Sequence, residues 1–305
     1  MELFNVSDTT SNSSMAHHVG SGMMALCFCL GVPGNIVVMV VILRSFKEDN
    51  FALRLMLNLA LSDVLCLSTV PVWIYEILHG WAFSRDLCMA VNYIVFSCLF
   101  ASVLTVSLMS LHRYLLVLHR RHWERLGRRG ERALMLGLWL YALVLAAPDV
   151  ALFDIVKYNS RQVCVQVTES HGEKVIVLTC ETLLGFAVPF GVIVVSYYHL
   201  HNQVIQSVYF RSPKLTRTVT LIVVTFVVSW APLQVMNILE ISSPQTYTGG
   251  KQRYVYMTQR VVGISLVFLN SCLNPFLYAM GFQGLCGGQC RIQSKEGTLS
   301  GEADD

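Results

Sequence analysis

The sequence predicts an all-α membrane protein, a bundle of seven transmembrane helices, on the basis of three observations. Only 13% of its 305 residues are charged, about half the share of an average soluble domain. Apolar blocks alternate with short polar segments, and each block reaches the roughly 20 residues that a spanning helix needs. The period-2 alternation of a β-barrel is absent. This composition excludes a disordered chain and almost any soluble enzyme, and a net charge of +3 gives no indication of a nucleic-acid partner.

The apolar blocks define the spans in order along the chain, at 20–43, 53–78, 88–118, 133–153, 174–205, 215–240 and 256–280. The connections are too short for a separate soluble domain. We therefore expect three regions: an extracellular N-terminal segment (1–19), a seven-helix domain (20–280) and a cytoplasmic tail (281–305). Each of the last four spans contains a proline that removes a backbone donor and kinks its helix: Pro148, Pro189, Pro232 and Pro275.

The distribution of basic residues predicts the orientation of the bundle. With the N-terminus outside, 15 of the 22 Lys and Arg residues face the cytoplasm and seven face outward. Cytoplasmic loops carry such an excess, so the N-terminus is predicted outside and the C-terminus inside. Two sequons in the N-terminal segment fit this orientation and predict glycosylation, at Asn5 and Asn12.

Two of the ten cysteines have positions that favour a disulfide. Most of the others lie inside predicted spans or in the tail, whereas Cys88 begins the third span and Cys164 lies in the loop after the fourth. Both positions are on the oxidising side of the membrane. A disulfide between them would fasten that loop over the mouth of the bundle.

Polar residues at membrane depth are costly and indicate function by default. Asp63 lies midway along the second span, and neutral oxygens occur at comparable depth at Ser102, Asn270, Ser271 and Asn274. One carboxylate with several neutral oxygens suits a weakly bound hard cation such as sodium. The alternative is a water-filled polar network that fixes helix packing, and the two are compatible. No other cofactor is expected, and no motif with metal-ligand spacing indicates an enzyme.

Several motifs, in order and at matching spacing, resemble the rhodopsin-like (class A) G-protein-coupled receptors. They are Gly34-Asn35, the Leu-Ala-Leu-Ser-Asp run ending at Asp63, Cys88 before Arg113, Trp139, Pro189 with Tyr197, Phe226 to Pro232 and Asn274-Pro-Phe-Leu-Tyr278. The resemblance implies a multi-pass plasma-membrane receptor, not an enzyme. It also implies that an extracellular agonist activates a heterotrimeric G protein, with arrestin as a further partner.

The same resemblance implies which residues switch the receptor and contact the G protein: Arg113, Tyr114, Tyr197, Phe226, Trp230, Pro232, Asn274, Pro275 and Tyr278. One position departs from the family. Where relatives carry an acid that pairs with the arginine, this chain has His112. The usual ionic lock of the inactive state is therefore in doubt, and raised basal activity is one open consequence.

At the predicted extracellular mouth, the candidate ligand contacts combine one arginine with polar and aromatic side chains: Arg260, Glu181, Asn237, Tyr93, Phe96, Asn92 and Trp73. An arginine above an apolar cleft suits an amphipathic carboxylate. Two alternatives stay open: Arg260 can snorkel to the interface, and Glu181 can pair internally with a neighbouring base.

Glu181 to Gly191, Phe100 to Leu104 and Trp230 to Asn237 resemble the leukotriene B₄ receptors of the chemoattractant branch. This implies a carboxylated lipid mediator as agonist, coupling to the Gi class and a role in chemotaxis. A chemoattractant peptide receptor is the alternative within the family. A polytopic transporter is the alternative from another class, but the inverted repeats typical of transporters are not evident.

Overall fold

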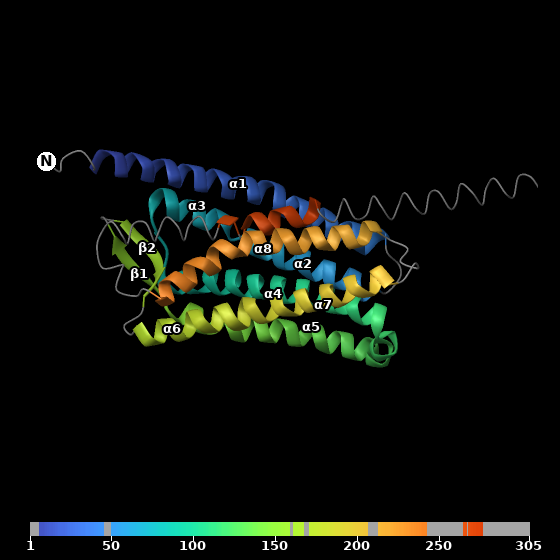
Figure 1. The fold of residues 1–305 in the computed structure, drawn as a ribbon. Coiled ribbons are helices and arrows are strands. Elements are labelled where there is room, and N and C mark those ends of the chain that lie inside the picture. The colour runs from blue at the N-terminus through green and yellow to red at the C-terminus, as the bar shows by residue number, and fades with distance from the viewer. Residues whose placement is uncertain are drawn as a thin grey trace, which may run out of the picture.

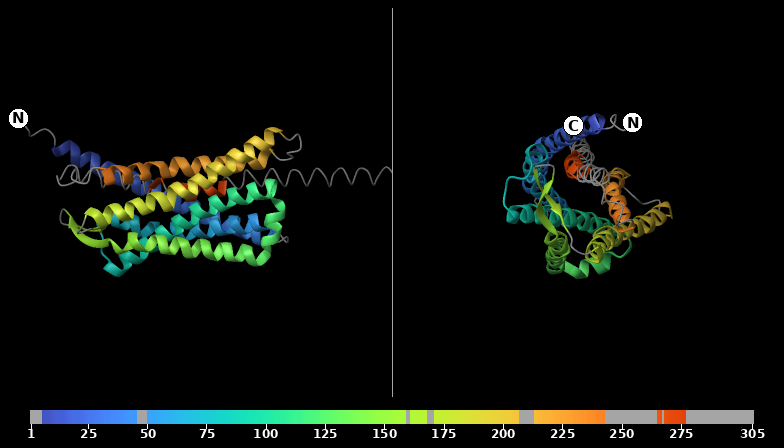
Figure 2. Two further views of the ribbon diagram at one scale, coloured as in Figure 1. Left: turned by 60° about the horizontal axis from the view of Figure 1, so that its bottom comes forward. Right: turned by 90° about the vertical axis from the view of Figure 1, so that its left-hand side faces the viewer.

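The structure is a computed structural model. It describes residues 6–45, 50–158, 161–167, 171–206, 213–242, 265–266 and 268–276. The described part is a bundle of long helices with one short β-hairpin at its end (Figure 1). The end-on view in Figure 2 shows the hairpin lying across that end of the bundle.

The elements follow the predicted spans in order. The first four spans correspond to α1 (Val6–Ser45), α2 (Phe51–Leu67) with α3 (Val70–His79), α4 (Arg85–Leu118) and α5 (Arg120–Ala151). The fifth is divided into α6 (His171–Cys180), a π-helix η1 (Glu181–Ala187) and α7 (Val188–Gln206), and the sixth is α8 (Pro213–Ser242). In the last predicted span, the described residues 265–266 and 268–276 are helical. Among the described residues, five helical stretches are long and apolar enough to cross a membrane, and Val224–Leu239 within α8 is a shorter apolar one.

The second span is not one continuous helix, which corrects the sequence-based expectation. Its two parts meet at Ser68 and Thr69, whose hydroxyls donate to the carbonyls of Val64 and Cys66, both at 2.7 Å. Pro71 follows within the first turn of α3 and has no N–H to continue the ladder. The break is therefore made by a proline together with side-chain hydroxyls that bond to the backbone.

Two helix starts also differ from the expectation. Helix α1 begins at Val6 rather than at residue 20. The sequence offers no reason for this extension, since the intervening Ser, Thr and Asn residues have low helix propensity. Helix α5 begins at Arg120 rather than at 133 and bends at Gly127, whose φ of 58° and ψ of −177° are non-helical. The basic segment before the fourth span is thus helical, and glycine makes the bend because this conformation is closed to most other residues.

The loop after the fourth span forms a hairpin that the sequence did not predict. Strands β1 (Phe153–Tyr158) and β2 (Arg161–Gln166) pair antiparallel, with Ile155 opposite Cys164. Helix α4 is the central element of the bundle and packs against α2, α5, α7 and β1. The amide of Asn58 joins three helices, because it donates to Thr105 Oγ1 at 2.7 Å and accepts from Trp139 Nε1 at 2.8 Å.

Candidate ligand-binding and switch site

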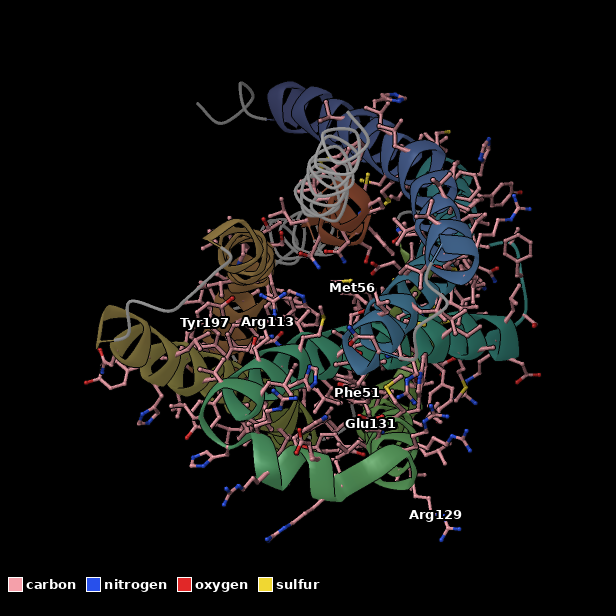
Figure 3. The ribbon with its side chains drawn as sticks, turned by 90° about the vertical axis from the view of Figure 1, so that its right-hand side faces the viewer. Phe51, Met56, Arg113, Arg129, Glu131 and Tyr197 are labelled. Carbon is pink, nitrogen blue, oxygen red and sulfur yellow. A yellow bond between two sulfur atoms is a disulfide. The ribbon has the colours of Figure 1, made fainter. Side chains whose placement is uncertain are left out.

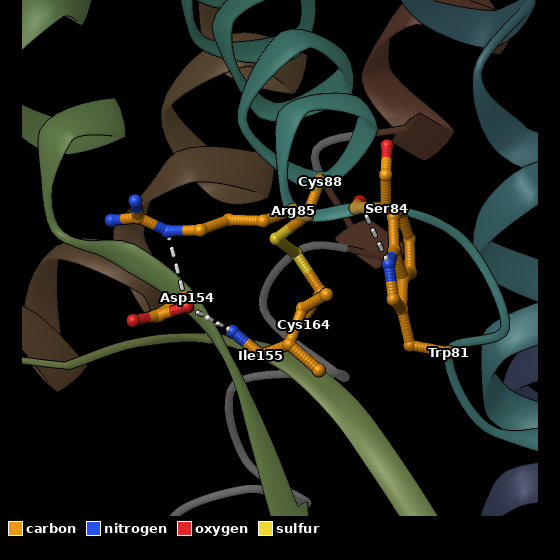
Figure 4. A network of polar contacts seen from close by, with 7 residues as sticks. All are labelled: Trp81, Ser84, Arg85, Cys88, Asp154, Ile155 and Cys164. Carbon is orange, nitrogen blue, oxygen red and sulfur yellow. Dashed lines mark hydrogen bonds and ion pairs between the residues drawn. A yellow bond between two sulfur atoms is a disulfide. The ribbon is translucent and has the colours of Figure 1, made fainter.

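A disulfide fixes the hairpin to the start of α4. The predicted bond between Cys88 and Cys164 is present, and the two Cα atoms are 5.9 Å apart (Figure 4). Asp154 on β1 accepts from Arg85 Nε at 3.1 Å and from its neighbour's backbone at Ile155 N at 2.7 Å. The disulfide and the ion pair thus attach both strands to the first turn of α4.

Helix α3 and the residues after it hold the other side of the hairpin. The Glu76 carboxylate accepts from the backbone N–H of Cys164 at 2.7 Å, and Trp81 N donates to Gln162 O at 2.7 Å. The Trp81 indole N–H donates to Ser84 O at 3.3 Å (Figure 4). The hairpin is therefore a fixed cover over the ends of α3 and α4.

Three of the predicted ligand residues lie close beneath this cover or beside it. Trp73 packs into the central apolar cluster of the bundle, 6.4 Å from the ring of Trp81. Phe96 packs under the hairpin, with its ring tilted by 55° against that of Phe153 and the two ring centroids 6.1 Å apart. Asn92 is directly under the disulfide: its amide donates to Cys88 O at 2.8 Å and to Cys164 Sγ at 3.3 Å.

The remaining predicted ligand residues are more dispersed. The Tyr93 hydroxyl donates to the carbonyl of Leu143 at 3.2 Å, which directs this ring to the interface of α4 and α5. Glu181 is buried at the start of η1, and Asn237 is buried on α8. Arg260, the predicted anchor, lies outside the described residues.

Sequence reasoning missed Gln234, which has the least satisfied buried amide on α8. Its side chain is 5% exposed, and neither amide atom has a hydrogen-bond partner among the described residues. Asn237 Nδ2, one turn further, also has no partner within the described part of the chain. Both residues follow Trp230 at helical spacing, so the positions 230, 234 and 237 could have indicated one polar face.

Earlier on α8, before Gln234, an aromatic stack connects this helix with η1. The Phe186 ring lies parallel to those of Phe226 and Trp230, with both centroid distances 6.3 Å and interplanar angles of 21° and 22°. The hydroxyl of Ser107 on α4 donates to Pro189 O at 3.1 Å. The predicted switch residues of α8 thus contact the irregular part of the fifth span, where Pro189 and the π-helix interrupt regular bonding.

The predicted cation site is centred on Asp63, which is fully buried. Asn274 Nδ2 donates to Asp63 Oδ2 at 2.7 Å, and Ser271 lies beside the same carboxylate. Asp63 Oδ1 has no hydrogen-bond partner in the part of the chain described. Asn274 therefore presents a donor to the carboxylate rather than a ligand oxygen, and the free oxygen of Asp63 is the feature that fits a cation.

The neighbouring polar residues connect this region to the first helix. Asn35 Nδ2 donates to Gly31 O at 3.0 Å and to Ser271 O at 3.1 Å. Ser102 and Asn270 are buried as well. The described residues 268–276 are thus joined to both α1 and α2 through side-chain amides.

At the opposite end of the bundle from the hairpin, Arg113 and Tyr197 lie next to each other (Figure 3). Tyr114 contacts the ring of His199 on α7, 5.8 Å between centroids. Pro275 packs against α1, since a Cβ added at Gly34 would stand 3.1 Å from its ring. Tyr278, the last predicted switch residue, lies outside the described residues.

The comparison with known protein families decides what this arrangement belongs to. The model of the 7 transmembrane receptor (rhodopsin family) matches residues 34–278. The chain belongs to the rhodopsin family of receptors. It is 29% identical to leukotriene B4 receptor 1 of Homo sapiens over 270 residues, which cover 86% of this chain and 76% of that protein.

Two further relatives of this receptor bear other names. The C3a anaphylatoxin chemotactic receptor of Danio rerio is 28% identical over 284 residues, 90% of this chain and 75% of the relative. The type-1 angiotensin II receptor A of Xenopus laevis is 29% identical over 270 residues, 84% and 74% of the two chains. The receptor is thus a multi-pass plasma-membrane protein of a family that couples to heterotrimeric G proteins, and it is not an enzyme.

In this receptor, His112 is not placed as a substitute for the family's acid. It is buried between the rings of Phe51 and Trp123, at centroid distances of 5.2 Å and 4.5 Å. Beside these rings, Arg54 on α2 forms an ion pair with Glu131 on α5, and its guanidinium lies 5.6 Å from the centre of the Phe51 ring. The end of the bundle is therefore tied by an aromatic cluster and by an ion pair between α2 and α5.

Proposed function

We propose that the receptor binds a carboxylated lipid mediator of the leukotriene B₄ type at the end of the bundle that the hairpin covers. On this proposal the end with the hairpin is extracellular. Agonist binding activates a heterotrimeric G protein of the Gi class at the opposite end, where Arg113 and Tyr197 lie. The names of the relatives and the apolar surroundings of Trp73 and Phe96 support this assignment.

The observation that carries the proposal is the pair of unsatisfied amides on α8. A buried polar group without a partner costs about 1–3 kcal/mol, and Gln234 and Asn237 are both buried with free donors among the described residues. Hydroxyl and carboxylate oxygens of an oxygenated fatty acid would satisfy these amides. Its hydrocarbon chain would lie against the apolar and aromatic side chains, and Arg260 would hold the carboxylate.

The same helix gives the proposal a route to the G protein. Trp230 lies four residues before Gln234, contacts Phe186 and Phe226, and is two residues before Pro232 within α8. An agonist that binds better when α8 is displaced raises the population of the open cytoplasmic state. Arg113 and Tyr197 then rearrange around the opened end, and by linkage the bound G protein tightens agonist binding.

The test uses the full-length receptor in cell membranes with Gi, and G-protein dissociation is measured against leukotriene B₄ concentration. Gln234→Leu and Asn237→Leu should each lower potency roughly fivefold, because one neutral hydrogen bond contributes about 1 kcal/mol. Arg260→Ala should lower it by about 10- to 150-fold. Val235→Ala is the matched control, since this side chain lies on α8 between the two amides and is 54% exposed.

A chemoattractant peptide is the second candidate, and buried Glu181 is the observation that favours it. A peptide with a basic terminus would pair with this carboxylate, so Glu181→Gln should weaken a peptide far more than a fatty acid. Dissociation of Gi driven by C3a-type peptides and not by leukotriene B₄ would contradict the lipid proposal. Equal potency of leukotriene B₄ on wild type, Gln234→Leu and Arg260→Ala would contradict the proposed contacts.

A further inference from the structure

Two buried cysteines that are far apart in the sequence lie next to each other in the core of the bundle. Cys27 belongs to α1 and Cys272 to the described helical residues 268–276 of the last predicted span, and they are 2% and 5% exposed. Both are free thiols of the central apolar cluster, and the Cys27 S–H donates a hydrogen bond to the Cys272 sulfur. Neither belongs to the disulfide under the hairpin or to the proposed agonist contacts.

A glycine on α1 lets the two helices approach closely beside these thiols. Gly31 follows Cys27 by four residues and therefore lies on the same face of α1. A Cβ added at Gly31 would stand 3.2 Å from the Cα and 3.3 Å from the Cβ of Cys272. A disulfide requires its two Cβ atoms to be about 3.5–4.5 Å apart, which only closely packed helices allow. The packing at Gly31 therefore favours a bond between Cys27 and Cys272.

A bond at this place would act on residues that the family resemblance assigns to the switch. Asn274 and Pro275 follow Cys272 by two and three residues. The segment is held to α1 by noncovalent contacts such as the hydrogen bond from Asn35 Nδ2 to Ser271 O at 3.1 Å. Such contacts can break when the receptor changes its state. A disulfide would keep the segment at α1 in every state.

We propose that Cys27 and Cys272 are an oxidation site, at which hydrogen peroxide converts the two thiols into a second disulfide that fastens the last span to α1. Because both thiols are buried, the oxidant has to be small and uncharged. Hydrogen peroxide has both properties, whereas glutathione disulfide has neither. The site is separate from the proposed agonist contacts, so it stands whatever the agonist is.

The reaction consumes one molecule of peroxide in two steps. In the first step, the sulfur of one cysteine, as its thiolate, attacks a peroxide oxygen, the O–O bond breaks, and a sulfenic acid forms. The departing hydroxide takes up the proton of that thiol and leaves as water. In the second step, the other sulfur attacks the sulfenic sulfur, the S–S bond forms, the S–O bond breaks, and a second water leaves with the proton of the second thiol. The two sulfurs together lose two electrons, and the peroxide is reduced to two waters.

The test treats the purified full-length receptor in phospholipid nanodiscs with hydrogen peroxide, and unreduced disulfide-linked peptides are mapped by mass spectrometry. A peptide pair that joins Cys27 to Cys272 is expected in the treated wild type. It should be absent from Cys27→Ala and from Cys272→Ser. Cys29→Ala is the matched control, because Cys29 lies two residues further along α1 and is exposed, and this variant should retain the linked pair.

Three outcomes of this mapping would overturn the proposal. The first is a linked pair of the same segments in Cys27→Ala, since Cys29 would then be the partner. The second is a wild type in which Cys29 is oxidised and the linked pair does not form. The third is formation of the linked pair to the same extent with glutathione disulfide, since the thiols would then be open to a large charged oxidant.

Two further measurements test the packing at Gly31 and the effect of the bond. Gly31→Ala should lower the yield of the linked pair severalfold, whereas Gly22→Ala, with nothing within 4 Å of its added Cβ, should leave it unchanged. Peroxide should raise the thermal unfolding midpoint of wild type by about 2–4 °C or more, because a crosslink constrains the unfolded chain, and should not raise that of Cys27→Ala. Equal yields in the two glycine variants, or an unchanged midpoint of the linked receptor, would contradict the proposal.

Discussion

At the scale of single residues, the carboxylate of Asp63 has incomplete hydrogen bonding. One carboxylate oxygen accepts from Asn274, and the other has no partner among the described residues. A sodium ion that binds the inactive bundle better than the active one must oppose agonist binding by linkage. Asp63→Asn should therefore abolish the sodium dependence of agonist affinity, measured against potassium at constant ionic strength. If wild type shows no sodium effect, Asp63 organises buried water and helix packing only.

The ion pair between Arg54 and Glu131 provides a second prediction at this scale. Both side chains are largely screened from solvent, and the pair joins α2 to α5 next to His112. A double-mutant cycle with Arg54→Gln and Glu131→Gln should give a coupling of about 1 kcal/mol in thermal unfolding of the purified receptor. The exposed pair of Arg120 and Glu124 on α5 is the control, and its coupling should be smaller. Equal couplings for the two pairs would contradict a special contribution from the first.

At the scale of elements, the bend in α5 depends on the backbone of one glycine. At Gly127 an added Cβ would have no neighbour within 4 Å, but φ is +58°. Gly127→Ala should therefore destabilise the receptor by about 1–3 kcal/mol through backbone strain alone. Gly137→Ala, on the same helix with equal space around it, should stabilise by up to about 1 kcal/mol. Thermal unfolding of the two variants measures the difference, and the same sign for both would show that the bend is not held at Gly127.

The order and type of the spanning elements could be predicted from the sequence, because long apolar blocks and their prolines are visible in it. The disulfide was also predictable, since Cys88 and Cys164 have distinctive positions. The hairpin was not, because its strands are short and their pairing is fixed by contacts with Glu76, Trp81 and Arg85 elsewhere in the chain. The packing of His112 between Phe51 and Trp123 could not be predicted either, because it depends on tertiary contacts between helices. The same holds for the hydrogen bond from Tyr93 to a carbonyl of α5.

At the scale of the whole molecule, the orientation in the membrane is open to a direct test. The excess of basic residues at one set of loops places the N-terminus outside, so Asn5 and Asn12 should carry N-glycans. Removal of N-glycans from receptor made in animal cells should increase its electrophoretic mobility. The double variant Asn5→Gln with Asn12→Gln should already migrate at the faster position. An unmodified wild-type receptor that is nevertheless active at the cell surface would contradict glycosylation at both sites.

The π-helix η1 has a consequence for how the fifth span is compared with those of relatives. A π-helical turn contains one residue more than an α-helical turn, so the helix on its two sides differs in rotational phase by about 100°. Glu181 and Gly185 are the buried residues of this π-helical segment. An alignment without a gap in this span pairs residues of α6 with the wrong positions of a relative whose span is uniformly α-helical. Deletion of one residue within Glu181–Ala187 should restore a continuous α-helix and turn all of α6 to a different face.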